Sequence, residues 1–170
     1  MDKIFDIKQI ITHSGDYHVD EIFAIALLAH VFRENGYFMP EIVRTRDEDM
    51  LKKASKDKKI ALIDVGRTYE PDMMNFDHHQ KSFDLEWESG TPLSSTGIIF
   101  KYLKENGLID SDDSTLQKFQ KNYVEPIDAM DNGISRITFF DMIYAFMPLS
   151  RVGVDEAFYK SLDMMTHIMP

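Results

Sequence analysis

The strongest constraint on the fold is a short, almost continuous run of apolar residues, KIALIDV, at residues 59–65. A strand that is apolar on both faces is typical of a parallel sheet with helices on each side. Two further β-branched runs precede it, at residues 8–13 and 41–45. Segments with helical spacing, residues 21–33 and 47–57, separate the three runs. The pattern therefore predicts an α/β fold with three layers: a mostly parallel sheet and helices on both faces.

After the third strand the pattern changes. Residues 66–92 lack a clear period and are predicted to form a loop. A helix is expected to begin at Ser94 or Ser95, because serine is a favourable N-cap, and to end at Gly107. The first half of the chain is thus expected to supply the sheet, and the second half to supply helices.

The rest of the chain is predicted to be helical. A helix is expected over residues 114–131, bent by Pro126, which cannot donate a backbone hydrogen bond. The stretch from there to residue 170 is rich in methionine and aromatic residues with helical spacing. At 170 residues the chain has the length of one domain. We expect residues 1–170 to form a single domain with a helical C-terminal part.

Composition and charge exclude several classes of function. The net charge of −10 argues against broad binding to duplex DNA, which requires a basic face. The chain has no cysteine, so a metal ion would have to be bound by histidine and carboxylate side chains. The apolar stretches are too short to cross a membrane, and the N-terminus lacks the apolar core of a signal peptide. We therefore expect a cytoplasmic protein that does not bind membranes.

Histidine and aspartate residues gather in a few segments that follow predicted strands or end a predicted helix. The set is His13, His18, Asp20, Asp64, Asp77, His78, His79, Asp128 and Asp131. Doubly wound sheets bind ligands beyond the carboxyl ends of their parallel strands. The segment with His13, His18 and Asp20 and the segment with Asp64 should meet there, and the Asp-His-His segment should lie one loop away. Crowded carboxylates repel one another unless a cation lies between them. The number of candidate ligands suggests two divalent ions, and imidazole with carboxylate suits Mn²⁺, Mg²⁺ or Fe²⁺ better than structural zinc.

Each segment alone has a plainer interpretation. Asp20 can cap a helix, Asp64 can be a turn residue, and Asp131 with the following Asn-Gly can form a turn. The Asp-His-His triplet at residues 77–79 can be an exposed loop. The order of these segments and their matching places at the ends of elements favour a common metal site.

Six segments of the chain resemble the melanocyte-proliferating-gene protein family, a branch of the DHH phosphoesterase superfamily. They are THSGDYHVDE, IVRTRD, IDVG, FDHHQ, LSSTGIIF and IDAMDNGIS. This resemblance runs from about residue 12 to residue 150. It implies a DHH phosphoesterase domain and metal-dependent hydrolysis of phosphodiesters, as in a 3′–5′ exonuclease that acts on short single-stranded RNA or oligonucleotides.

The resemblance also implies roles for individual residues. One metal ion would be bound by His13, His18 and Asp64, and the second by Asp20, Asp64, His78 and Asp131, with Asp128 as the alternate to Asp131. Both ions are expected to be Mn²⁺, with Mg²⁺ as the alternative, and to activate a water molecule that attacks phosphorus. Asp77 would orient an imidazole, and His79 would contact the substrate phosphate.

Three further residues are candidates for binding phosphate. Arg44 and Arg46 should share one face at the end of a strand and can clamp a phosphate, or can form ion pairs with nearby acidic residues. Ser95 lies at a predicted helix N-terminus, which can bind a phosphate or can simply be capped.

Members of the family are longer and carry a C-terminal domain that closes over the site. We expect that substrate-capping domain to be absent or truncated here, and a homodimer could supply the missing surface. Three functions stay open: an exonuclease or oligonucleotide phosphodiesterase, a DHH-type phosphohydrolase of a small nucleotide or pyrophosphate, and a non-catalytic metal-binding regulatory module.

Overall fold

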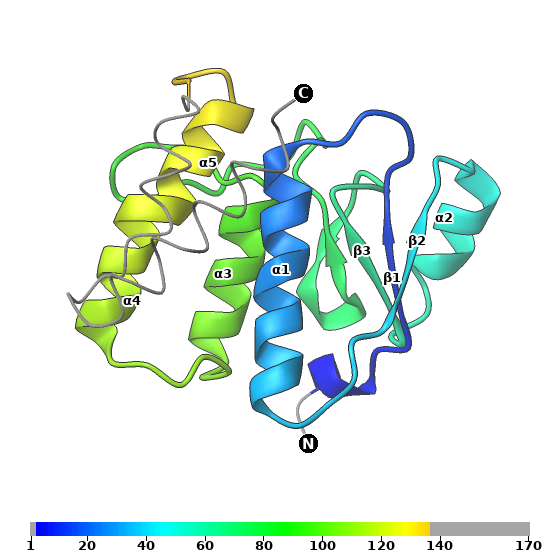
Figure 1. The fold of residues 1–170 in the computed structure, drawn as a ribbon. Coiled ribbons are helices and arrows are strands. Elements are labelled where there is room, and N and C mark those ends of the chain that lie inside the picture. The colour runs from blue at the N-terminus through cyan, green and yellow to red at the C-terminus, as the bar shows by residue number, and fades with distance from the viewer. Residues whose placement is uncertain (1–2, 137–170) are drawn as a thin grey trace, which may run out of the picture.

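A five-stranded sheet forms the centre of the computed structural model, which describes residues 3–136 (Figure 1). The strand order is β2-β1-β3-β5-β4, and only β4 runs antiparallel to its neighbour. The predicted α/β fold with a mostly parallel sheet is therefore confirmed. The strands are β1 (Gln9–Thr12), β2 (Glu41–Arg44), β3 (Ile60–Ile63), β4 (Tyr69–Glu70) and β5 (Asn75–Phe76).

Helices connect and follow these strands. They are α1 (Val19–Glu34), α2 (Glu48–Ala54), α3 (Ser95–Glu105), α4 (Asp113–Phe119) and α5 (Glu125–Asp131), with short 3₁₀ turns η1 (Lys3–Asp6) and η2 (Pro71–Met73) and a π-helical turn η3 (Gln120–Val124). Within residues 3–136, no helix combines the length and apolarity that a membrane span requires. The helical stretch predicted beyond residue 136, and the dimer contact suggested for it, lie outside the described residues.

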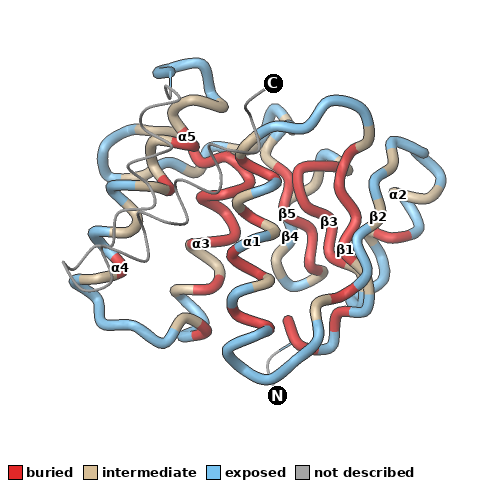
Figure 2. Tube along the Cα trace, in the orientation of Figure 1, coloured by how far each residue is buried: buried red, intermediate tan, exposed pale blue. Residues whose placement is uncertain are grey.

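The sheet is covered on both faces, but unequally. Successive side chains of a strand point to opposite faces. Accordingly, Ile10 and Ile63 join a large core that includes residues of α1 and α3, while Ile11 and Leu62 join a small core with Ala54 of α2. Figure 2 shows the buried strands and the buried sides of α1 and α3 in red. The larger core holds the central strands firmly in place beside α1 and α3.

The strand order creates a switch point at the carboxyl ends of β1 and β3. The chain leaves β1 through α1 to add β2 on one side, then returns through α2 to add β3 on the other side of β1. Because the two crossovers run in opposite directions, their helices lie on opposite faces of the sheet. The loops that follow β1 and β3 therefore diverge, and the space between them is where doubly wound folds bind ligands.

The prediction of a continuous loop over residues 66–92 is wrong. This segment contains β4, η2 and β5, and β5 pairs in parallel with β3. Strands of two residues are too short to show a sequence period, so only the pairing of β5 with β3 and of β4 with β5 reveals them. The helix expected over residues 114–131 is helical throughout, but η3 interrupts it just before Pro126, whose ring would clash with the carbonyl group of an ordinary helical turn.

The N-terminus of α3 is capped by a residue from α5. Asp128 accepts hydrogen bonds from the backbone N–H groups of Ser94 (3.0 Å) and Gly97 (2.9 Å). Gly97 permits this contact: a Cβ atom there would lie 2.2 Å from Oδ2 of Asp128 and 2.9 Å from Cγ of Leu93. The close approach of α3 and α5 therefore requires glycine at this position.

We expect Gly97→Ala to destabilise the protein by about 1–3 kcal/mol, because the added methyl group overpacks the contact with Asp128. At a helix position without such a contact, the same change would stabilise the protein by roughly 0.5–1 kcal/mol. The sign of the change in stability therefore tests the contact. Urea unfolding followed by circular dichroism measures it. Gln117→Ala, on the exposed side of α4, is the control and should change stability by less than about 0.5 kcal/mol. A Gly97→Ala protein as stable as the wild type would contradict the packing described.

Candidate metal centre

Three side chains of the predicted set follow three neighbouring parallel strands directly. His13 follows β1, Asp64 follows β3 and Asp77 follows β5. The Asp-His-His triplet, expected one loop away, lies at this same edge because it directly follows β5. All three side chains are buried. The edge of the sheet thus presents one imidazole and two carboxylates side by side.

Asp64 lies between two histidines that come from different segments. Its Oδ2 atom is 3.2 Å from Nε2 of His13, and its Oδ1 atom is 3.2 Å from Nε2 of His78. Asp64 also has a φ of 56°, a left-handed conformation that is uncommon for residues other than glycine and is often found at functional sites. Each oxygen of this carboxylate therefore faces a separate cluster of candidate ligands.

The second cluster surrounds His78. Its Nε2 atom lies 3.4 Å from Oδ2 of Asp131 and 3.8 Å from Oδ2 of Asp20, in addition to its contact with Asp64. Two ligand atoms that bind one ion at about 2.1 Å lie roughly 3.0–3.4 Å apart in tetrahedral or octahedral geometry. The spacing around His78 is close to that range.

Several buried atoms of these residues have no hydrogen-bond partner. They are Nε2 of His13, Nε2 of His78, and both carboxylate oxygens of Asp20. The two imidazole nitrogens lie near carboxylates but are not aligned with them as donor and acceptor. Because an unpaired buried polar atom is costly, such a group requires another explanation. A divalent cation bound between these atoms fits the chemistry of the donor set, since imidazole and carboxylate are ligands for Mn²⁺ and related ions.

His18 begins α1 at the surface, and its backbone N–H donates to both oxygens of Glu21 at 2.9 Å. The ring centroid of His18 is 5.4 Å from that of His13. Glu21 was not a candidate in the sequence analysis, yet it is 1% exposed and its Oε1 atom is 3.3 Å from Nε2 of His13. His13, His18, Glu21 and Asp64 together offer ligand atoms within 4.8 Å of one another. The sequence feature that could have drawn attention to Glu21 is its spacing, three residues after an N-cap residue.

Asp77 and His79 form a pair beside these clusters. Oδ1 of Asp77 accepts hydrogen bonds from Nδ1 (2.8 Å) and the backbone N–H (3.0 Å) of His79, and Oδ2 accepts one from the N–H of Arg67 (2.6 Å). The hydrogen bond that His79 donates to Asp77 raises the pKa of His79 to about 9, despite partial burial. Burial alone would raise the pKa of Asp77, but these hydrogen bonds hold it below its ordinary value. His79 therefore carries a positive charge at neutral pH, on a side chain that is 54% exposed.

Asp128 and Ser95 are occupied elsewhere. Besides capping α3, Asp128 accepts hydrogen bonds from Oγ of Ser94 (2.7 Å) and Nε1 of Trp87 (2.7 Å). Burial raises its pKa to about 6, while these donors oppose the shift. Oγ of Ser95 donates to Oδ1 of Asp64 at 3.0 Å, and the residue is fully buried. Ser95 thus contacts a candidate ligand, and the N-terminus of α3 is capped by a carboxylate.

Arg44 and Arg46 hold the loop that follows β1. Arg44 donates to the carbonyl oxygens of His13 (3.2 Å) and Gly15 (2.8 Å), and Arg46 donates to that of Ser14 (2.8 Å). The alternative of ion pairs with nearby acids is not found for either arginine within residues 3–136. Two positive charges therefore stand beside the clusters without a neutralising carboxylate in the described part of the chain.

The acidic side chains of the second cluster affect one another. Burial, followed by the charges of Asp64, Asp131 and Glu21, raises the pKa of Asp20 to about 9. Burial and the charge of Asp64 also raise the pKa of Asp131, although the neighbouring histidines oppose this shift. Without a cation, the folded protein therefore retains a proton that the unfolded chain, with Asp20 at its ordinary pKa of 3.8, has already released.

We expect the metal-free protein to lose stability as the pH rises between these two pKa values, because only the folded state binds the extra proton there. In chelator, the melting temperature should fall by on the order of 10 °C between about pH 5 and about pH 8. Asp20→Asn removes this titration and should flatten the dependence. Differential scanning calorimetry in matched buffers measures both proteins, and equal slopes would contradict the assignment of the shift to Asp20.

Comparison with known proteins identifies relatives of the chain. Residues 9–148 match the model of a protein family described as uncharacterised protein family UPF0160, whose model is named for MYG1 exonuclease. The chain is 39% identical to the MYG1 exonuclease of Homo sapiens over 150 residues, which cover 79% of this chain and 38% of that protein. It is 35% identical to a MYG1 protein of Schizosaccharomyces pombe over 142 residues, covering 76% and 41%.

The chain thus spans less than half the length of the curated relatives that it matches. No solved structure matches it. The family model covers most of the chain, including the segments that carry the clusters around Asp64, from His13 to Asp131. The chain therefore belongs to the MYG1 exonuclease family.

Proposed function

We propose that this chain forms the metal-binding part of a phosphodiesterase of the DHH superfamily that removes nucleotides from the 3′ end of short single-stranded RNA. The observation that carries this proposal is Asp64, whose two oxygens face His13 and His78 in two ligand clusters. A bridging carboxylate between two such clusters is the arrangement that two-metal hydrolysis requires. Relatives named MYG1 exonuclease support the reaction class.

In this proposal the ligands of one ion are His13, His18 and Asp64, and those of the second are Asp20, Asp64, His78 and Asp131. Two Mn²⁺ ions, or Mg²⁺ as the alternative, would supply an activated water and neutralise charge on the phosphoryl group. We assign Asp131 and not Asp128 to the second ion, because the carboxylate of Asp128 already accepts four hydrogen bonds, from Ser94 (two), Gly97 and Trp87. Ser95 then serves to orient Asp64.

The other polar residues of the edge would bind the substrate. His79, positively charged and half exposed, can donate to a phosphoryl oxygen beside Asp64, from which its Nδ1 is 3.4 Å away. Asp77 would hold that ring in place through its hydrogen bond. Arg44 and Arg46 supply charge for further phosphates of a strand.

Hydrolysis assays test the reaction. Protein supplied with Mn²⁺ should shorten a 5′-labelled RNA of several nucleotides from its 3′ end and should also cleave a diribonucleotide. Asp64→Ala, which removes the bridging carboxylate, should lower the rate by about 10³-fold or more, since it disrupts both ion sites. A DNA strand of the same sequence and pyrophosphate are parallel substrates.

Each outcome of these assays has a definite meaning. Turnover of pyrophosphate alone would replace the proposal with a small-anhydride hydrolase. No turnover of any of these substrates with Mn²⁺ or Mg²⁺ would leave a metal-binding module. Equal rates for wild type and Asp64→Ala would show that the cleavage comes from a contaminant.

Substitutions of Asp131 and Asp128, which lie on one helix, distinguish the proposed metal ligand from the carboxylate that caps α3. Asp131→Asn should leave the metal-free protein at least as stable as the wild type, because it removes repulsion within the acidic cluster, and should reduce the rise in melting temperature on adding Mn²⁺. Asp128→Asn should lower the stability by about 2–4 kcal/mol, because it replaces a buried acceptor of four hydrogen bonds, and should retain the response to Mn²⁺. The reverse pattern would exchange the two roles.

A further inference from the structure

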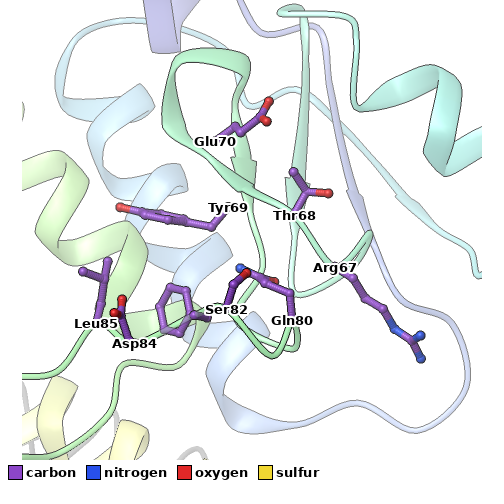
Figure 3. Close-up of a pocket in the computed structure, with 9 residues that line it drawn as sticks. Arg67, Thr68, Tyr69, Glu70, Gln80, Ser82, Asp84 and Leu85 are labelled. Carbon is purple, nitrogen blue, oxygen red and sulfur yellow. The ribbon is translucent and has the colours of Figure 1, made fainter.

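A pocket of about 360 Å³ opens beside the Asp-His-His segment, between the edge strand β4 and the loop that follows β5. Its volume is at the lower end of the range for small-molecule sites. Figure 3 shows Tyr69 and Leu85 on one side of it, with Gln80 and Ser82 between them and Arg67. None of the roles proposed above for the metal ligands and phosphate contacts uses this pocket.

The pocket is joined to the proposed site through Asp77. The backbone N–H of Arg67 donates to Oδ2 of Asp77, and Nε2 of Gln80 donates to its carbonyl oxygen at 2.9 Å. Phe83, which also lines the pocket, has its ring centroid 6.3 Å from that of His78. One wall of the pocket therefore contacts Asp77, which holds His79, and lies beside the proposed metal ligand His78.

The aromatic lining suits a flat ring. Tyr69 and Phe83 meet edge to face, with ring centroids 5.4 Å apart and an angle of 89° between their planes. Leu85 adds an aliphatic contact beside them. Aromatic side chains of this kind are the usual platforms for unpaired nucleobases.

The polar lining suits a hydrogen-bond donor and disfavours an anion. Nε2 of Gln80 is engaged by the carbonyl oxygen of Asp77 and Oε1 is buried, so this amide offers neither group to a ligand in the pocket. Two carboxylates, Glu70 and Asp84, also line the pocket, whereas the guanidinium of Arg67 points away from Tyr69 (Figure 3). A phosphate group would be repelled here, while a base with an amino or ring N–H group would be accepted.

We propose that this pocket binds the nucleobase of a substrate nucleotide whose phosphate lies at His79 and the metal ligands. The proposal rests on the function proposed above and adds a physical reason for acting on single strands. A base inside the pocket cannot stack in a duplex or pair with a partner base, so entry selects nucleotides that are already unpaired.

Binding of two phosphates tests the pocket without requiring turnover. Adenosine 5′-monophosphate and ribose 5-phosphate carry the same phosphorylated sugar and differ by the base. By isothermal titration calorimetry with the Mn²⁺-supplied protein, the nucleotide should bind about tenfold more tightly or better, since base stacking on aromatic side chains contributes on that scale. Equal affinities would overturn the proposal, whether or not the protein hydrolyses RNA.

A matched pair of variants locates the base. Ser82→Phe fills the pocket from its exposed rim and should abolish the difference in affinity between the two ligands. Lys81→Phe adds the same ring one position earlier, at an exposed residue that does not line the pocket, and should keep the difference. If Ser82→Phe does not fold, Asp84→Ala removes an exposed carboxylate acceptor from the pocket lining and should reduce the difference at least threefold.

The outcomes separate this proposal from the one on which it rests. A preference for the nucleotide that survives Ser82→Phe and Asp84→Ala would place the base elsewhere and overturn the pocket. Absence of RNA cleavage together with a preference that Ser82→Phe abolishes would keep the nucleobase pocket and remove the exonuclease.

Discussion

The arrangement of candidate ligands depends on one buried carboxylate, that of Asp64. It is placed by the end of β3, held by Oγ of Ser95, and turned by a left-handed backbone so that its two oxygens face His13 and His78. Asp64 contacts both of these histidines, which come from segments distant in the chain. A shift of this carboxylate would remove the candidate ligand that the two clusters share.

The sheet provides the rigid frame for this arrangement. Neighbouring strands lie about 4.8 Å apart, so residues that follow β1, β3 and β5 are brought close to one another by strand pairing alone. The core packed by α1 and α3 fixes these strand ends more firmly than loops could. The same frame concentrates negative charge in a buried place. The raised pKa of Asp20 reports the resulting repulsion, which a bound cation would relieve.

Much of the fold was predictable because its signals are local. The apolar runs at β1 and β3 and the helical spacing of α1 identified the α/β architecture, and the histidine and aspartate segments identified the site region. β4 and β5 were missed because two residues cannot show a period, and the pairing of β5 with β3 and of β4 with β5 joins separate segments of the chain. Glu21 was missed because its spacing also fits an ordinary helix cap.

Asp128 and Asp131 illustrate what only the tertiary structure can decide. Residues three apart on a helix lie on nearly the same face, so the sequence alone could not assign them different roles. Packing of α5 against α3 engages Asp128 with Trp87, Ser94 and Gly97, and leaves Asp131 beside His78.

The sequence by itself determined the kind of sheet, the types of ligand and the segments that carry them, because patterning and side-chain chemistry are properties of short stretches. The tertiary structure alone decided which oxygen faces which histidine, which carboxylate caps a helix, and where a pocket opens beside Asp77. These depend on the packing of elements distant in the chain, and no local pattern encodes that packing.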